Sequence, residues 1–218
     1  MMKAILIGAT GLVGSEILKQ LLSDTRFSEI HVFTRHSTEI SHPKLREIIV
    51  DFEKLTAWET QISGDVLFSA LGTTLKQSGS QQAQYRIDHD YQLQVATAAK
   101  KNGVQKIVLI SSASANPDSK IFYLRMKGQL ETHIAALGFD KTCFIQPGPL
   151  EGPRNHPRLT EKISLALLHC LPKIPGTEKF WPIKAADVAH VCIESAVKEE
   201  KGIDRLDPKE IFAQIKKK

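Results

Sequence analysis

The residues that most constrain the fold are 3–14, Lys-Ala-Ile-Leu-Ile-Gly-Ala-Thr-Gly-Leu-Val-Gly. Their apolar run Ala4–Ile7 is typical of a buried strand. Gly8, Gly11 and Gly14 follow at equal spacing, and a helical pattern of apolar residues comes next. A strand, a glycine turn and a helix predict a diphosphate group at the helix N-terminus, with Gly8 for the tight turn, Gly11 for close backbone approach and Gly14 for helix–strand packing. A glycine-rich turn that binds no ligand is the alternative.

Strand-like and helix-like segments alternate over the first two thirds of the chain. The strand candidates are short and rich in Val, Ile and Leu: Ala4–Ile7, Glu29–Thr34, Arg46–Val50, Asp65–Ser69, Lys106–Ile110 and Thr142–Gln146. The helix candidates carry apolar residues at helical spacing: Val13–Leu22, Glu53–Gln61, Ala83–Lys101 and Ile121–Leu137. Alternation of this kind implies right-handed crossovers. It predicts an α/β fold, a doubly wound parallel sheet with helices on both faces.

The segment after the sixth predicted strand differs from the rest, because prolines are frequent over Pro147–Pro182. It has no alternating strand pattern and one apolar helical patch, at Leu159–Leu171. We expect residues 149–185 to form a small proline-rich, substrate-side insertion over the carboxyl ends of the strands, where doubly wound sheets bind ligands. A final helix, Ala186–Lys198, should return to the core. The chain is thus predicted to form a single domain, residues 1–218.

Composition excludes several classes of protein. The chain is 42% hydrophobic and 24% charged, and no apolar run approaches the about 18 residues that span a bilayer, so no membrane partner is expected. Its net charge of +5 comes from basic residues scattered among acids, so nucleic acid is not an expected partner either. Cys143, Cys170 and Cys192 are far apart, and no charged-then-apolar leader precedes the first strand. Both features predict a cytoplasmic location.

The end of the second predicted strand bears on the choice of nucleotide. In dinucleotide-binding folds an acidic residue about 20 positions after the glycines binds the adenosine ribose. The chain has Thr34-Arg35-His36 at this place and no carboxylate. The Arg35 guanidinium can hold a 2′-phosphate bidentately, which favours NADP(H) over NAD(H), although an exposed strand-end arginine leaves NAD open. Asp51, which ends the third strand, can accept from the adenine amino group or cap the helix near Glu53.

A second group of residues follows the fifth predicted strand. Ser111 and Ser112 end this strand, and Tyr123 and Lys127 lie at the start of the next helix, on one face. An ordinary phenol, with a pKa of about 10, is a poor acid–base catalyst at neutral pH, and a fixed cation nearby favours the phenolate. We expect Tyr123 to donate a proton, Lys127 to assist it and bind the nicotinamide ribose, and Ser112 to polarise a substrate carbonyl. An amphipathic helix with a buried tyrosine and a surface lysine is the alternative.

Together, the glycine motif, Ser111-Ser112 and Tyr123-x-x-x-Lys127 resemble the short-chain dehydrogenase/reductase superfamily, in its atypical branch. Further segments are similar to the NAD(P)-binding oxidoreductases related to the Tat-interacting protein, which include small bacterial homologues: Ala70–Thr74, Tyr123–Gly128 and Gln146–Pro149. The resemblance covers nearly the whole chain and implies a Rossmann fold, NADPH binding and carbonyl reduction. It assigns these residues to the cofactor: Gly8, Thr10, Gly11, Leu12 and Val13 at the diphosphate, Arg35 at the 2′-phosphate, Leu71, Gly72 and Thr73 near the ribose, and Pro147 and Gly148 at the nicotinamide.

Two features depart from the superfamily pattern. The asparagine that typical members carry in the fourth helix is not evident, and Asp88 lies near that place. The spacing Gly-x-x-Gly-x-x-Gly fits atypical members, some of which are regulatory rather than catalytic. His89, between two acidic residues, is expected on the helix surface, and Cys143 is expected to be a core thiol rather than a nucleophile.

The sequence therefore predicts an NADP(H)-dependent oxidoreductase that transfers hydride to or from a small carbonyl or alcohol, with Ser112, Tyr123 and Lys127 as its catalytic set. A redox-sensing NADPH-binding regulator that acts through a protein partner is the alternative. Histidines and cysteines show no metal-ligand spacing, so no metal is expected. We expect a monomer or a homodimer, the dimer by resemblance only.

Overall fold

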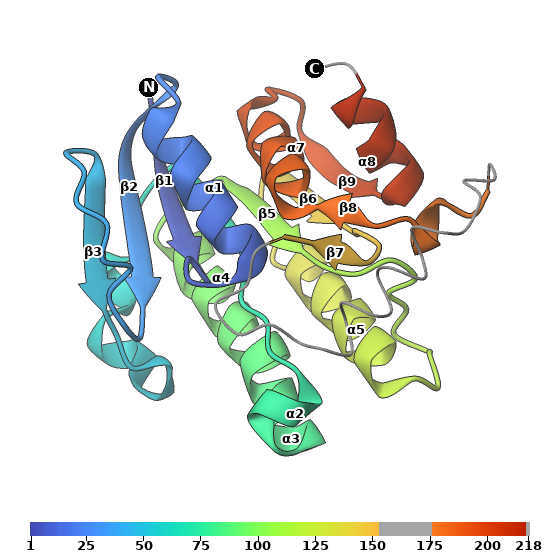
Figure 1. Ribbon diagram of the computed structural model, residues 1–218. Coiled ribbons are helices and arrows are strands. Elements are labelled where there is room, and N and C mark those ends of the chain that lie inside the picture. Colours follow the sequence, from blue (N-terminus) through green and yellow to red (C-terminus); the bar gives the residue numbers. More distant parts are fainter. Residues whose placement is uncertain (153–175, 217–218) are drawn as a thin grey trace.

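The computed structural model describes residues 1–152 and 176–216 (Figure 1). Within them, parallel strands form a seven-stranded sheet in the order β3-β2-β1-β4-β5-β6-β9. The strand bounds are β1 Met2–Ile7, β2 Phe27–Thr34, β3 Leu45–Ile49, β4 Val66–Ser69, β5 Lys106–Ile110, β6 Lys141–Ile145 and β9 Gly202–Leu206. The predicted doubly wound parallel sheet is thereby confirmed. The helical patch predicted at Leu159–Leu171 lies outside the described residues.

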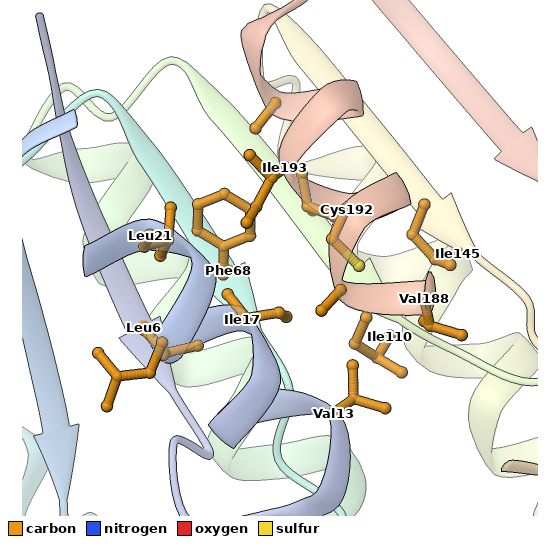
Figure 2. Close-up of a cluster of buried hydrophobic side chains, with 14 of the residues drawn as sticks. Leu6, Val13, Ile17, Leu21, Phe68, Ile110, Ile145, Val188, Cys192 and Ile193 are labelled. Atoms are coloured by element: carbon orange, nitrogen blue, oxygen red, sulfur yellow. The ribbon is translucent and has the colours of Figure 1, made fainter. Parts of the chain in front are cut away.

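Helices cover both faces of this sheet, because successive side chains of a strand point to opposite sides. Ala4 and Leu6 of β1 pack in one cluster with α1 (Leu12–Ser23), α7 (Ala185–Val197) and α8 (Pro208–Ile215). Ile5 and Ile7 pack in the other with α4 (Tyr91–Lys101) and α5 (Phe122–Ala136). Figure 2 shows the first cluster, in which side chains of α1 and α7 meet over the sheet. Each Leu or Ile buried there contributes about 1.5–3 kcal/mol to the hydrophobic stabilisation.

The predicted helices form, but two of them are divided. The segment predicted at Ala83–Lys101 consists of α3 (Gln81–Tyr85), a π-helical turn η3 (Arg86–Asp90) and α4. The segment predicted at Glu53–Gln61 forms two short 3₁₀ helices, η1 (Phe52–Ala57) and η2 (Glu59–Gln61), and Lys54 inside η1 has a non-helical backbone. A further short helix, α2 (Leu75–Ser78), precedes α3. Among the described residues, no helix has the length and apolar character needed to cross a membrane.

The prediction that the helix over Ala186–Lys198 ends the fold is wrong, because β9 and α8 follow it. β9 is an edge strand with mostly exposed side chains, so it has no apolar run to reveal it. The helix after it, α8, has Asp207 as its N-cap, and the side chains and backbone amides of Asp207 and Glu210 form a reciprocal capping box. The short strands β7 (Leu150–Glu151) and β8 (Ile183–Lys184) pair in parallel, and η4 (Glu178–Phe180) precedes β8.

The turn between β1 and α1 brings backbone segments into direct contact. Gly8 has φ +83°, in the left-handed region that favours glycine. A Cβ on Gly8 would lie 2.4 Å from the Ala70 carbonyl oxygen, and a Cβ on Gly14 would lie 2.0 Å from the Gly8 carbonyl oxygen. Helix α1 can therefore approach the end of β1 only because residue 14 has no side chain.

We expect Gly14→Ala to lower the free energy of unfolding by about 3 kcal/mol or more, because the methyl group overlaps a backbone oxygen that cannot move aside. Urea denaturation followed by circular dichroism measures the change. Gly72→Ala is the matched control, since a Cβ there meets no atom within 4 Å and should change the stability by less than about 1 kcal/mol. Equal stability of the two variants would contradict the packing argument.

Candidate functional site

The carboxyl ends of the parallel strands lie at one edge of the sheet, and the loops after them carry the predicted site residues. β1 and β4 are neighbours in the sheet, but the chain continues from β1 toward β2 and from β4 toward β5. Ligands of open α/β sheets bind in the crevice at such a reversal of strand order. The loops that border the crevice are joined, since the Ala70 N–H donates to the Ile7 carbonyl at 3.0 Å.

Helix α1 begins at this crevice, directly after the glycine turn. Its N-cap is Gly11, and no side chain caps the amides of the first turn. Such amides have no partner within the helix, and with the helix dipole they attract an anion. Thr10 and Gly11 are exposed, and Leu12 and Val13 supply the next amides. This turn has the chemistry of a phosphate-binding site.

The loop after β6 contains the predicted residues Pro147 and Gly148. The Pro147 carbonyl accepts a hydrogen bond from the Ala113 N–H at 2.9 Å, which joins this loop to the loop after β5. A Cβ on Gly148 would lie 2.9 Å from the Lys179 carbonyl oxygen, so the chain that leaves β6 passes close to the chain that returns from residue 176 onward.

Both ends of the segment 149–185, which was predicted to lie on the substrate side, are also near this edge. β7 pairs with β8, and the Ile183 N–H donates to the Pro149 carbonyl at 2.9 Å. A Cβ on Gly152 would lie 2.8 Å from Leu12 Cδ1, so the start of the segment passes beside the first turn of α1.

Arg35 and Asp51 follow β2 and β3 at the same edge. Arg35 is exposed and makes no ion pair among the described residues, so its guanidinium is available to an anion. Asp51 is exposed and caps η1, since its carboxylate accepts from the Glu53 N–H at 3.0 Å. Its main-chain carbonyl accepts from the Trp58 indole N–H at 3.0 Å. The capping role is thus observed, and the adenine contact of Asp51 stays a prediction.

The loop after β4 holds Leu71, Gly72 and Thr73 against η3. Leu71 and Thr73 are half-buried and Gly72 is exposed. The Thr73 N–H donates to Asp88 Oδ1 at 2.7 Å. Asp88 is 1% exposed, and its Oδ2 has no hydrogen-bond partner. Burial raises the pKa of Asp88, and the positive charge of Lys127 opposes this rise.

The side chains of Tyr123 and Lys127 differ sharply in burial. The lysine is buried and the tyrosine is exposed, which is the reverse of an amphipathic helix with a buried tyrosine and a surface lysine. Tyr123 is 37% exposed and Lys127 is 3% exposed. The Lys127 ammonium donates to the Ile110 carbonyl at 3.3 Å, at the end of β5. Ser112 is half-buried, and its hydroxyl makes a long contact of 3.4 Å with the Ala113 carbonyl. Among the described residues no hydrogen bond joins Tyr123 to Ser112 or Lys127.

A buried carboxylate that the sequence did not single out fixes α5 to the sheet. Glu131 is 5% exposed and accepts a short hydrogen bond from the Ser111 hydroxyl. The Gln146 amide donates to both of its oxygens, at 2.9 and 3.1 Å, and Arg205 Nε lies 3.6 Å away. Ser111 directly follows β5, Gln146 directly follows β6, and Arg205 lies in β9. The only sequence signal was the position of Glu131 four residues after Lys127, on the same helical face.

The prediction that His89 lies on the helix surface is wrong. The ring is 4% exposed, with Nε2 at 2.9 Å from His133 Nδ1 and Nδ1 at 2.8 Å from Asp90 Oδ1. Burial lowers the pKa of His89. The π-helical turn explains the difference, because it rotates this residue out of the regular helical spacing. Cys143 is fully buried, and burial raises the pKa of its thiol to about 11, in keeping with the predicted core role.

A groove of about 710 Å³ opens beside α3 and η3. Glu53, Tyr85, Arg86, Tyr91 and Phe122 are among the residues that line it. None of the predicted catalytic or cofactor residues contributes to this groove. Its lining therefore differs from the residues predicted to bind the cofactor or to act in catalysis.

Comparison with known families agrees with this geometry. A family described as NAD(P)H-binding matches residues 8–199, from the glycine turn to just beyond α7. The chain belongs to this NAD(P)H-binding family. It is also homologous to fungal FMP52 proteins. "Protein FMP52-1, mitochondrial" of Scheffersomyces stipitis is 36% identical over 92% of this chain and 91% of its own length. "Protein fmp52, mitochondrial" of Aspergillus niger is 32% identical over 90% of this chain and 88% of its own length.

The names of these relatives overturn the predicted cytoplasmic location, because the FMP52 proteins are named as mitochondrial. The prediction rested in part on few, scattered cysteines, and these indicate reducing conditions without specifying one compartment. The relatives are also not named as bacterial or as Tat-interacting proteins, so that narrower resemblance stays a prediction.

Solved structures share the fold of this chain. MoeE5 in complex with UDP-glucose and NAD superposes with a TM-score of 0.73 and 16% identity, over 99% of this chain and 81% of that one. UDP-N-acetylglucosamine 4-epimerase from Methanobrevibacter ruminantium superposes with a TM-score of 0.70 and 20% identity, over 94% of this chain and 76% of that one. At these identities the likeness shows the fold alone. It confirms the predicted Rossmann-like class.

The contacts of Glu131 lead to a prediction about stability. Glu131→Ala leaves the Ser111 hydroxyl and the Gln146 amide without their buried acceptor, so the free energy of unfolding should fall by about 2 kcal/mol or more in urea denaturation. Glu131→Gln keeps one acceptor and should cost less. Thr132→Ala, at the next and exposed position, is the control and should change the stability by less than about 0.5 kcal/mol. If Glu131→Ala were as stable as this control, the anchoring role would be excluded.

Proposed function

We propose that the protein is an NADP(H)-dependent oxidoreductase of the atypical short-chain dehydrogenase/reductase type, which transfers hydride to or from a small carbonyl or alcohol. The observation that carries this proposal is the uncapped start of α1, where the glycine turn brings backbone amides to the crevice between β1 and β4. Membership of the NAD(P)H-binding family supports it. The names of the fungal relatives support a mitochondrial location.

The residues present fit such a nucleotide. Gly8 and Gly14 have no room for a Cβ, so the turn keeps a shape in which the first-turn amides suit a diphosphate. Arg35 has no ion-pair partner in the described part of the chain, which leaves its guanidinium free for a 2′-phosphate. When bound, the nicotinamide supplies the hydride chemistry. The remaining contacts are proposed for Leu71, Gly72 and Thr73 at the ribose and for Pro147 and Gly148 at the nicotinamide.

The chain's own residues would handle the proton and the charge on the carbonyl oxygen. Tyr123 Oη donates the proton to this oxygen, and Ser112 Oγ donates a hydrogen bond to it. The buried ammonium of Lys127 favours the phenolate that remains on Tyr123. The partial exposure of Tyr123 leaves its hydroxyl accessible to a substrate.

One observation favours the regulator as a second candidate. Within the described residues, Tyr123 has no hydrogen bond to Ser112 or Lys127, so the three side chains do not form a connected set in this state. A regulator that senses NADPH and acts through a protein partner needs the glycine turn and Arg35, and it does not depend on Tyr123. Substitution of Tyr123 therefore separates the two functions.

Arg35→Ala tests the choice of nucleotide. Loss of a charged hydrogen-bonding group should raise the Kd for NADPH roughly tenfold or more in calorimetric titration, and the Kd for NADH by less than about twofold. Arg46→Ala is the control, because Arg46 is also exposed and lies near the start of the neighbouring strand β3, away from the carboxyl ends of the strands. An unchanged NADPH-to-NADH ratio in Arg35→Ala would show that this arginine does not bind the 2′-phosphate.

Tyr123→Phe tests the reaction. Removal of the proton donor should reduce NADPH oxidation with a panel of small aldehydes and ketones by about 100-fold or more, with the Kd for NADPH within about twofold of the wild type. Tyr85→Phe, which also loses a hydroxyl on a neighbouring helix, should keep its activity. Equal loss of turnover and NADPH binding in Tyr123→Phe would argue against the proton-donor role. NADPH binding without turnover by the wild type would favour the regulator.

A further inference from the structure

A buried carboxylate oxygen at the crevice has no role in the function proposed so far. Asp88 is 1% exposed; its Oδ1 accepts from the Thr73 N–H at 2.7 Å, and its Oδ2 makes no hydrogen bond of good geometry within the described residues, although the Gln84 side chain is close enough to lower the pKa of the carboxyl. Buried polar atoms nearly always have a hydrogen-bond partner, because leaving one unpaired costs about 1–3 kcal/mol. The other unpartnered side-chain atoms among the described residues belong to uncharged hydroxyls and an imidazole: Thr38, Ser195 and His31.

The fold holds this carboxylate in place from both sides. Asp88 lies in the π-helical turn η3, a wider form of helix that often occurs at functional sites. The Gln92 amide donates to the Asp88 main-chain carbonyl at 2.6 Å, and the Ser69 hydroxyl at the end of β4 donates to Gln92 Oε1 at 2.8 Å. These bonds connect the turn that carries Asp88 to the carboxyl edge of the sheet, beside the loop after β4 whose Thr73 N–H binds the carboxylate.

A buried positive charge faces the same region. Lys127 is 3% exposed, and its ammonium donates to the Ile110 carbonyl at the end of β5, the strand next to β4. Its charge acts on Asp88, and yet the two side chains form no ion pair within the described residues. An ammonium has only donors and a carboxylate only acceptors, so a group between them must both accept and donate. Hydroxyl groups have this property.

From this arrangement we propose that Asp88 is a nucleotide-binding residue, whose Oδ2 accepts a hydrogen bond from a ribose hydroxyl of the cofactor. The neighbouring hydroxyl of the same ribose accepts from the Lys127 ammonium. The adenosine ribose of NADP(H) carries a phosphate on its 2′ oxygen, so the nicotinamide ribose is the one with two free adjacent hydroxyls. This assignment rests on the proposed function, and it adds a residue to the binding site.

Asp88→Asn tests the assignment with little change of shape. The amide keeps an oxygen for the Thr73 N–H, and it replaces the free acceptor by an NH₂ group that cannot accept. The Kd for NADPH in calorimetric titration should rise by about tenfold or more. The Kd for adenosine 2′,5′-bisphosphate, which lacks the nicotinamide ribose, should change by less than about twofold. Asp90→Asn is the matched control, because Asp90 is the nearby, more exposed carboxylate of the same turn and should leave both affinities unchanged.

A ligand variant makes the test independent of whether Asp88→Asn folds well. Wild-type protein should bind NADP⁺ at least about tenfold more tightly than an analogue whose nicotinamide ribose lacks both hydroxyls, and Asp88→Asn should reduce this preference. Equal weakening of NADPH and the bisphosphate by Asp88→Asn, or no weakening of either, would overturn the assignment while leaving the proposed function intact. Wild-type protein that binds neither nucleotide would contradict the proposed function itself, and the assignment with it.

Discussion

Gly14 of α1 contacts the carbonyl oxygen of Gly8, and this contact sets where the helix begins relative to the sheet. Gly8 in turn lies against the main chain of Ala70, after β4. The ends of β1 and β4 and the start of α1 are thus fixed to one another with no side chain between them. A ligand group bound at the amides of α1 therefore has a defined position relative to the loops after β4 and β5, because the backbone contacts leave little freedom for adjustment.

Helix α5 is held against the same edge by polar contacts in a buried setting. Lys127 reaches the end of β5, Glu131 binds Ser111 and Gln146, and the backbone of Gly128 lies against the turn at Asn116 so closely that a Cβ would be 2.2 Å from its carbonyl carbon. Tyr123 lies nearer the N-terminus of the helix and is exposed. The helix thus combines a fixed body with an accessible phenol, as the proposed role of Tyr123 requires.

The central sheet was largely predictable from the sequence. β1 to β6 lie within two residues of the predicted bounds. For β1, β2, β4, β5 and β6 the reason is burial on both faces, which demands continuous runs of Val, Ile and Leu, whereas the edge strand β3 is only half-buried and still carries an apolar pair, Ile48 and Ile49. β9 was missed because it lies at the sheet edge, with Ile203 at 46% exposure, so that pairing rather than burial defines it. Spacing placed Tyr123 and Lys127 on one helical face but could not show which of the two is buried. The π-helical turn was not predicted either. It interrupts the 3.6-residue period of an α-helix, and the prediction of which helix face carries Asp88 and His89 depends on that period.

The two-residue pairing of β7 with β8 joins the start and the return of the chain that leaves the sheet after β6. β7 and β8 form a sheet of their own, so the register of the seven-stranded sheet does not depend on the length or composition of the chain between them. Lengthening a closed loop costs little free energy, about 0.6 kcal/mol for each doubling. Residues between β7 and β8 can therefore change in number during evolution while the glycine turn at the start of α1 stays as it is.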